Sequence, residues 1–130
     1  MPASPERSQF QYAVVRVVPR VERGECLNAG VVLLCRPRRF LASRTFLDPV
    51  RLRALAPDAD ADVVAAHLVA IDRIAAGDPG EGPIARMTKP ERFHWLVAPS
   101  STIIQPSEVH SGLCEDPAAE LEHLFRTLVL

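Results

Sequence analysis

The stretch that decides the fold is QYAVVRVVPRVERGECLNAGVVLLCR, residues 11–36. Its first part, residues 11–18, is rich in β-branched residues and ends before Pro19, which has no N–H to donate to a strand ladder. Residues 20–25 form a polar turn in which Gly24 supplies backbone freedom, and residues 26–36 form a second apolar run. Two such runs joined by a short turn predict a β-hairpin.

Alternating apolar residues on the two runs are expected to share one face of the hairpin. They are Ala13, Val15 and Val17 on the first run and Leu27, Ala29, Val31, Leu33 and Cys35 on the second. A slip of one residue would turn either set towards solvent, so the register should keep both sets on the core side. Arg16 and Asn28 then lie on the opposite face as neighbours.

The residues after the hairpin predict a third strand and two helices. Residues 40–47 continue the alternation and extend the hairpin into a three-stranded meander. Asp48 and Pro49 are typical of a helix N-cap and a first helical residue, and they predict a short helix over residues 50–55. Residues 60–76 carry apolar side chains at helical spacing and precede Gly77, which predicts a longer amphipathic helix.

The C-terminal half predicts further helices and a short strand. Thr88 and Glu91 match a capping box and predict a helix to residue 96, although residues 93–97 also alternate as a strand would. Residues 102–105 predict a fourth strand, followed by an irregular loop through Gly112. Asp116 and Pro117 predict the start of a last helix, which carries an apolar stripe.

These elements together predict an α+β fold, in which an antiparallel β-meander of three strands, with a later fourth, packs against three to four α-helices. The chain has 130 residues, of which 48% are hydrophobic, and a net charge of −1, which fits a single domain with its own core. We expect this domain over residues 10–130, after a flexible N-terminus over residues 1–9. The sequence has neither a run of ~18 uncharged apolar residues nor a secretory signal, which predicts a cytoplasmic protein.

The charges are unevenly spread along the chain. Residues 1–57 carry ten basic residues and four acids, a net charge of +6, whereas residues 58–130 carry five and twelve, a net charge of −7. One interpretation is a nucleic-acid interface that uses Arg36, Arg38, Arg39 and Arg44. The other is that the charges of the two halves complement each other within one fold. The second interpretation is favoured because the net charge of the whole chain is not positive.

The sequence contains no strong catalytic signature, and two polar segments are the candidates for a site. In residues 25–30, Glu25 and Asn28 open an otherwise apolar strand, and the glycine at position 30 indicates a bulge or a close approach of another group. With Arg16 they could line a polar pocket. The alternative is a network at the hairpin end in which these side chains satisfy turn backbone groups.

The second segment, residues 93–107, is dense in hydroxyls. Ser101, Thr102 and Gln105 could bind a phosphate or position a water, or the hydroxyls could simply cap turns around the prolines. His94 and His110 could act as acid or base because their pKa values lie near neutrality. The candidate catalytic residues are therefore Glu25, His94 and His110, and the candidate binding residues are Arg16, Asn28, Ser101, Thr102 and Gln105.

The cysteines and histidines do not predict a metal site. Three cysteines, Cys26, Cys35 and Cys114, argue against a disulfide framework because their number is odd and no two are close. The spacing of His94, His110 and Cys114 matches no zinc motif. A nucleophilic pair of Cys114 and His110 is a weak alternative, and we expect no metal and no cofactor.

Five segments, in order along the chain, resemble one bacterial family. They are residues 12–19 (YAVVRVVP), 23–33 (RGECLNAGVVL), 92–95 (RFHW), 101–105 (STIIQ) and 109–113 (VHSGL). The set resembles the uncharacterised bacterial family DUF3037, a domain of unknown function. The chain departs from the family pattern at Ser100, where the pattern has arginine, and at Glu108, where it has proline. The first departure puts anion binding near Ser100 in doubt.

This resemblance implies a small cytoplasmic protein without an assigned activity. Genes of the family often lie beside genes for HipA-like kinases, which implies a partner or accessory role. The leading hypothesis is therefore a protein-binding accessory module, with a HipA-like kinase as partner. The alternative is a small hydrolytic or phosphoryl-handling enzyme, which requires the two polar segments to converge, and the nucleic-acid binder is a weaker third hypothesis. The partner hypothesis predicts an exposed apolar patch or a free sheet edge.

Overall fold

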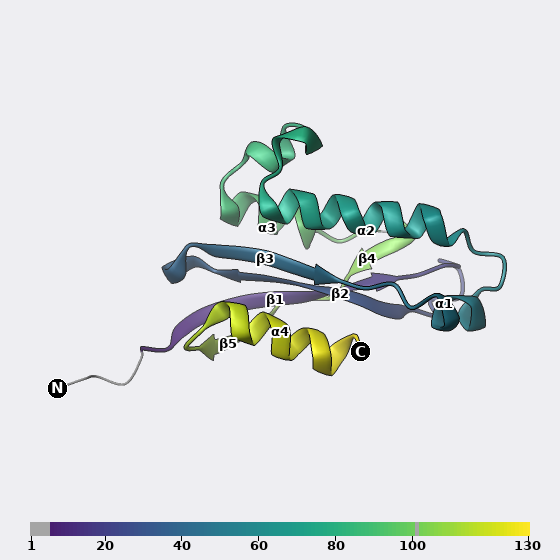
Figure 1. The fold of residues 1–130 in the computed structure, drawn as a ribbon, viewed down its shortest axis with the longest axis horizontal. Helices are drawn as coiled ribbons and strands as arrows, with labels where there is room; N and C mark the ends of the chain where they lie inside the picture. Colours follow the sequence, from purple (N-terminus) through teal and green to yellow (C-terminus); the bar gives the residue numbers. More distant parts are fainter. Residues whose placement is uncertain (1–5, 101) are drawn as a thin grey trace.

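An antiparallel five-stranded sheet separates two helical layers (Figure 1). The structure is a computed structural model that describes residues 6–100 and 102–130. The strands are β1 (Ser8–Val17), β2 (Leu27–Cys35), β3 (Phe40–Thr45), β4 (Ile104–Pro106) and β5 (His110–Cys114). The first three pair in chain order, so the α+β class and the meander are confirmed. β1 begins at Ser8, before the predicted run of residues 11–18.

Strand β1 is the central strand, and its second edge is shared by β4 and β5. β4 pairs with the C-terminal end of β1, and β5 pairs with its N-terminal end. The prediction of an irregular loop through Gly112 is therefore wrong, because β5 begins at His110. The cause is a tertiary contact: a Cβ at Gly112 would lie 2.8 Å from the ring of Phe10, so this ring packs directly on the glycine backbone.

Four helices complete the fold. They are α1 (Pro49–Leu55), α2 (Ala61–Ala76), α3 (Lys89–Leu96) and α4 (Pro117–Leu128). Their N-caps are Asp48, Asp60, Thr88 and Asp116, of which Asp48, Thr88 and Asp116 are predicted from the sequence, and at α3 the capping box is complete. The helical interpretation of residues 89–96 is thus confirmed over the strand alternative. α2 and α3 cover one face of the sheet and α4 covers the other (Figure 1).

The hairpin is buried on both faces, which corrects the predicted sharing of a single face. Val15 and Ala29 pack under α2 and α3, whereas Val31, Leu33 and Cys35 pack under α4. The cause is a β-bulge: Val15 pairs with Gly30 but Arg16 pairs with Asn28, so one extra residue on β2 reverses the alternation.

The glycine at position 30 is needed for this arrangement. A Cβ there would lie 2.8 Å from the carbonyl oxygen of Arg44 and 2.8 Å from Cγ2 of Thr45. Both interpretations of this glycine, a bulge and a close approach of another group, are confirmed.

Two polar contacts fix the helical layers to the edge strand β3. Asp72 of α2 accepts hydrogen bonds from Ser43 Oγ at 2.5 Å and Thr45 Oγ1 at 2.6 Å. On the other face, Arg44 pairs with Glu122 of α4 at 2.6 Å and lies 4.6 Å from the ring centroid of Phe125. Within the described residues, every helix is too short or too polar to cross a membrane.

Candidate functional site

Three of the predicted binding residues form a polar row across adjacent strands. Arg16 of β1 is the register partner of Asn28 on β2 and of Gln105 on β4. Because register partners project their side chains from the same face, the three side chains lie side by side. The expectation that Arg16 and Asn28 are neighbours is confirmed.

The amides of this row bond to the fold itself. Asn28 Nδ2 donates to the carbonyl oxygen of Leu128 at 3.0 Å, and Gln105 Nε2 donates to that of Thr102 at 2.9 Å. Asn28 thus satisfies a backbone group, though one of α4 rather than one of the turn. Arg16 Nε is buried and, among the described residues, has no hydrogen-bond acceptor. The guanidinium of Arg16 is therefore the group of this row left to bind a ligand.

The candidate catalytic residues lie apart. Glu25 is exposed in the turn after β1, where it pairs with Arg23. His94 is exposed on α3, which covers one face of the sheet. His110 is exposed on β5, and its ring centroid lies 5.2 Å from that of Tyr12, a residue packed with the α4 layer. The structure does not bring Glu25, His94 and His110 into one site.

In the described part of the hydroxyl-rich segment, the hydroxyls form hydrogen bonds within a turn. Thr102 Oγ1 donates to the carbonyl oxygen of Ile104 at 2.8 Å and lies 2.9 Å from Ser100 Oγ. The predicted binding residue Ser101 lies outside the described residues. Thr102 and Ser100 nevertheless border a cavity.

A pocket of about 350 Å³ opens between α2, the C-terminal end of α3 and β4. Its lining is mostly apolar, with His67, Ser100 and Thr102 as its polar members. The full lining is Val15, His67, Ala70, Ile71, Ile74, Trp95, Leu96, Ala98, Pro99, Ser100, Thr102, Ile104 and Pro106. An apolar cavity of this size with a few polar groups is typical of a binding site.

Trp95 lies at this pocket and is half exposed, at 50%. A tryptophan beside buried apolar residues is expected in the core, and this one is not buried. The cause is the helical phase of α3, which buries Phe93 at 1% exposure and therefore points a side chain two positions later in another direction. A large aromatic side chain is thus left at the rim of an apolar pocket.

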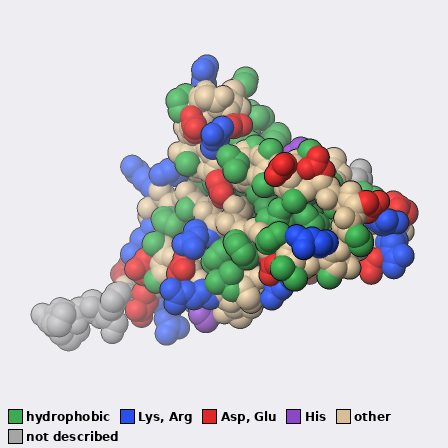
Figure 2. Space-filling model, turned by 45° about the vertical axis from the view of Figure 1, so that its right-hand side comes forward, with side chains coloured by type: hydrophobic (Ala, Val, Ile, Leu, Met, Phe, Trp, Pro, Cys, Tyr) green, Lys and Arg blue, Asp and Glu red, His purple; other side chains and the backbone are tan. Residues whose placement is uncertain are grey.

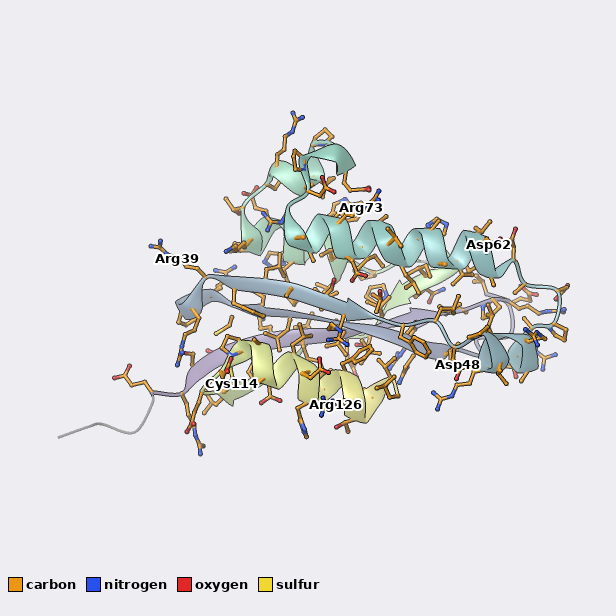
Figure 3. All side chains as sticks on the ribbon, viewed as in Figure 1. Arg39, Asp48, Asp62, Arg73, Cys114 and Arg126 are labelled. Carbon is orange, nitrogen blue, oxygen red and sulfur yellow. The ribbon has the colours of Figure 1, made fainter. Side chains whose placement is uncertain are left out.

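The outward surface of α2 extends the apolar character of the pocket. Asp62, Asp72 and Arg73 are the charged residues of this helix, so residues 63–71 carry no Lys, Arg, Asp or Glu. Within that stretch Val63 and Val69 are exposed, at 47% and 46%. Figure 3 shows Asp62 and Arg73 towards opposite ends of α2. Sequence reasoning missed this surface, although the uncharged stretch was visible in the sequence.

The four arginines of the nucleic-acid hypothesis do not form one surface. Arg36, Arg38 and Arg39 lie in the turn between β2 and β3, whereas Arg44 is held on the α4 layer by Glu122 and Phe125. Figure 2 shows basic and acidic side chains interspersed around a central group of hydrophobic ones on the face in view.

The buried Cys114 offers no nucleophile at neutral pH. Burial, with Cys35 close by, raises the pKa of the Cys114 thiol to about 11. Such a thiol stays protonated, so the pair of Cys114 and His110 lacks the thiolate it needs. In the part of the chain that the structure describes, no group of three or more His, Cys, Asp or Glu side chains could hold a metal ion.

Comparison with known proteins gives one match. No curated protein and no solved structure matches the chain significantly. The family model described as "Protein of unknown function (DUF3037)" matches residues 12–129, nearly the whole chain. These residues include the hairpin, the pocket and the polar row. The chain therefore belongs to the DUF3037 family, as the resemblance of its five segments predicted.

Proposed function

We propose that this chain is a protein-binding accessory module of the bacterial cytoplasm. Its docking surface is the α2–α3 surface, which we define as the pocket around Trp95 together with the outward residues 63–70 of α2. The observation that carries the proposal is the half-exposed Trp95 beside an apolar pocket of about 350 Å³. Tryptophan is among the residues most enriched at the energetic centres of protein interfaces.

The chemistry of the surface supports an apolar occupant. The pocket lining contains no Lys, Arg, Asp or Glu side chain among the described residues. A charged ligand group would lose its hydration there without gaining a partner, whereas an apolar side chain would gain from leaving water. We propose that a partner protein inserts an apolar side chain into the pocket and covers Trp95.

The outward face of α2 gives the partner a longer contact. A surface helix normally pairs one apolar stripe with a charged opposite face. α2 buries Val64 and Leu68 against the sheet and still presents Val63 and Val69 to solvent. A second apolar face on one helix is typical of an interaction surface. The edge position of β3 in the sheet adds a second place where another chain could pair.

A HipA-like kinase is the partner that we propose to test first. The family resemblance implies this association, and the kinase would supply the apolar side chain. In this proposal the chain acts by binding and the kinase supplies the chemistry.

The experiment is a comparative capture. Tagged wild-type chain, Ala70→Glu and Ala118→Glu are incubated with extract of the native host and, separately, with a purified HipA-like kinase. Ala70 lines the pocket and Ala118 is exposed on α4, so both variants add one charge at an alanine. We expect a stoichiometric partner with wild type and with Ala118→Glu, and its loss with Ala70→Glu. Equal capture by all three, or no stoichiometric partner, overturns the proposal.

A further inference from the structure

Three basic side chains gather at the turn between β2 and β3. Arg36 and Arg39 come from this turn, and Lys89 comes from the first residue of α3. The neighbouring Arg38 is not part of the cluster, because it donates to Ser8 Oγ at 3.1 Å and to the carbonyl oxygen of Glu6 at 2.8 Å. Lys89 Nζ donates to the carbonyl oxygen of Arg39 at 2.6 Å, which holds the two segments together. We call this cluster the basic tip. Arg39 projects outward at the end of the sheet (Figure 3).

The basic tip has no carboxylate partner within the described fold. Contacts with carboxylates are made by Arg20, Arg23, Arg44, Arg51, Arg73 and Arg126. Among the described residues, none of the three tip side chains makes such a contact. The nearby Glu91 is held by Thr88 in the capping box. The tip is therefore a concentration of positive charge that the fold does not neutralise.

A second pocket, of about 380 Å³, lies within the tip. Its lining is Leu34, Arg36, Arg39, Lys89 and Pro90. The wall of this pocket is mostly apolar, and three of its five lining side chains are cationic. A ligand that fits it places an apolar group in the pocket and a negative charge beside that group.

The backbone of Arg39 adds an independent observation. Its φ is 52°, in the left-handed region, and it is the one non-glycine residue with positive φ in the described chain. This conformation is sterically unfavourable for a residue with a Cβ, and a glycine would adopt it without that strain. The turn itself therefore does not explain an arginine at this position, whereas a role for its side chain does.

We infer that the basic tip binds an acidic segment of a partner protein, in which a carboxylate flanks an apolar side chain. This inference rests on the proposed function, because it states the chemistry of a second contact with the partner. Lys89 and Trp95 lie at opposite ends of α3, about 9 Å apart along the helix at 1.5 Å per residue. One partner can therefore reach both sites.

The observations favour a protein over a nucleic acid. Binding to single-stranded nucleic acid combines a long basic groove with aromatic side chains that stack on bases. The basic tip is short, and the residues lining its pocket include no aromatic side chain. The net charge of the whole chain is −1, whereas nucleic-acid-binding domains are usually basic.

The test is a fluorescence anisotropy titration with a labelled peptide of alternating glutamate and leucine. A labelled single-stranded DNA of similar charge serves as the second probe. At about 20 mM salt, where screening is weak, we expect the wild-type chain to bind the peptide more tightly than the DNA. The double variant Arg39→Gly with Lys89→Gln should lose about tenfold in affinity, and Arg53→Gln, a change of one exposed arginine on α1, should not.

The single variant Arg39→Gly separates binding from folding. We expect it to bind more weakly than wild type and to unfold at an equal or higher temperature, because glycine relieves the positive φ. No peptide binding at low salt, unchanged binding by the double variant, or tighter binding of the DNA overturns the inference. Ala70→Glu should still bind the peptide. If the peptide does not bind while the partner is still captured, only the inference about the basic tip is rejected. If the partner is not captured while the peptide still binds, only the proposal about the α2–α3 surface is rejected.

Discussion

The backbone N–H of Val14 donates a hydrogen bond to Oγ of Ser107 at 2.8 Å. The backbone N–H of Ser107 donates in return to the carbonyl oxygen of Val14, also at 2.8 Å. Both residues are buried, at 6% and 4% exposure. Ser107 thus lies between β4 and β5 and is hydrogen-bonded to the middle of β1. Its hydroxyl takes the place of the backbone carbonyl that a regular strand would offer as acceptor.

Removal of this hydroxyl should destabilise the fold. In Ser107→Ala the buried N–H of Val14 loses its acceptor, which costs about 1–3 kcal/mol of the free energy of unfolding. Urea denaturation measures this cost. Ser111→Ala, at an exposed position on β5, is the control and should change stability by less than about 0.5 kcal/mol. Equal stability of the two variants would show that the bridge contributes nothing.

The anchor between α2 and β3 gives a second prediction. In Asp72→Ala the hydroxyls of Ser43 and Thr45 lose a shared charged acceptor, so we expect a loss of about 2–3 kcal/mol in thermal or urea unfolding. Asp62→Ala changes the same residue type at an exposed position of α2. A loss in Asp72→Ala no larger than in this control would contradict the anchor.

The pKa of Cys114 predicts a pH dependence of stability. The folded chain keeps this thiol protonated up to about pH 11, whereas the unfolded chain releases the proton from about pH 9. Between these values the unfolded state binds fewer protons than the folded state, so the free energy of unfolding falls as the pH rises. Below about pH 9 this contribution is constant.

Comparison with Cys114→Ala isolates this effect from other groups that titrate in the same range. The difference in free energy of unfolding between wild type and variant should shrink from pH 9 to pH 11. Parallel profiles of the free energy of unfolding against pH for the two proteins would contradict the raised pKa.

In the native state at pH 8, the exposed Cys26 should react with a thiol reagent well before Cys114.

The fold was predictable wherever local chemistry agreed with tertiary packing. The hairpin, the four N-caps and the end of α2 at Gly77 each follow from residue types whose backbone preferences the structure keeps. β5 was not predictable, because Gly112 weakens a strand and only its contact with the ring of Phe10 explains it. The two buried faces were missed because the register was predicted from alternation alone, although the glycine at position 30 indicated the bulge that reverses it.

The candidate site was predictable only in part. Arg16 and Asn28 were placed side by side from strand alternation, and Gln105 joined them through a long-range pairing that no local pattern contains. The pocket was missed because its walls come from α2, α3 and β4, which are separated in sequence. The exposure of Trp95 depends on the rotation of α3, which the competing strand pattern concealed.

Arg16 gives a further prediction. Its Nε is buried without an acceptor among the described residues, so Arg16→Met should raise the free energy of unfolding by about 1 kcal/mol. Such a gain is typical of residues kept for binding rather than for stability. Arg53→Met on the exposed surface of α1 is the control, with no change expected. A loss of stability in Arg16→Met would show that the guanidinium supports the fold.

The most direct test of the docking proposal is the Kd between the chain and the partner that the capture experiment yields, measured by calorimetry. Trp95→Ala removes the half-exposed indole at the pocket, and Leu113→Ala removes an even more exposed side chain, at 61%, on β5. We predict that Trp95→Ala weakens binding at least about tenfold and that Leu113→Ala leaves Kd within about twofold of wild type. An unchanged Kd for Trp95→Ala would contradict the assignment of the α2–α3 surface as the docking site.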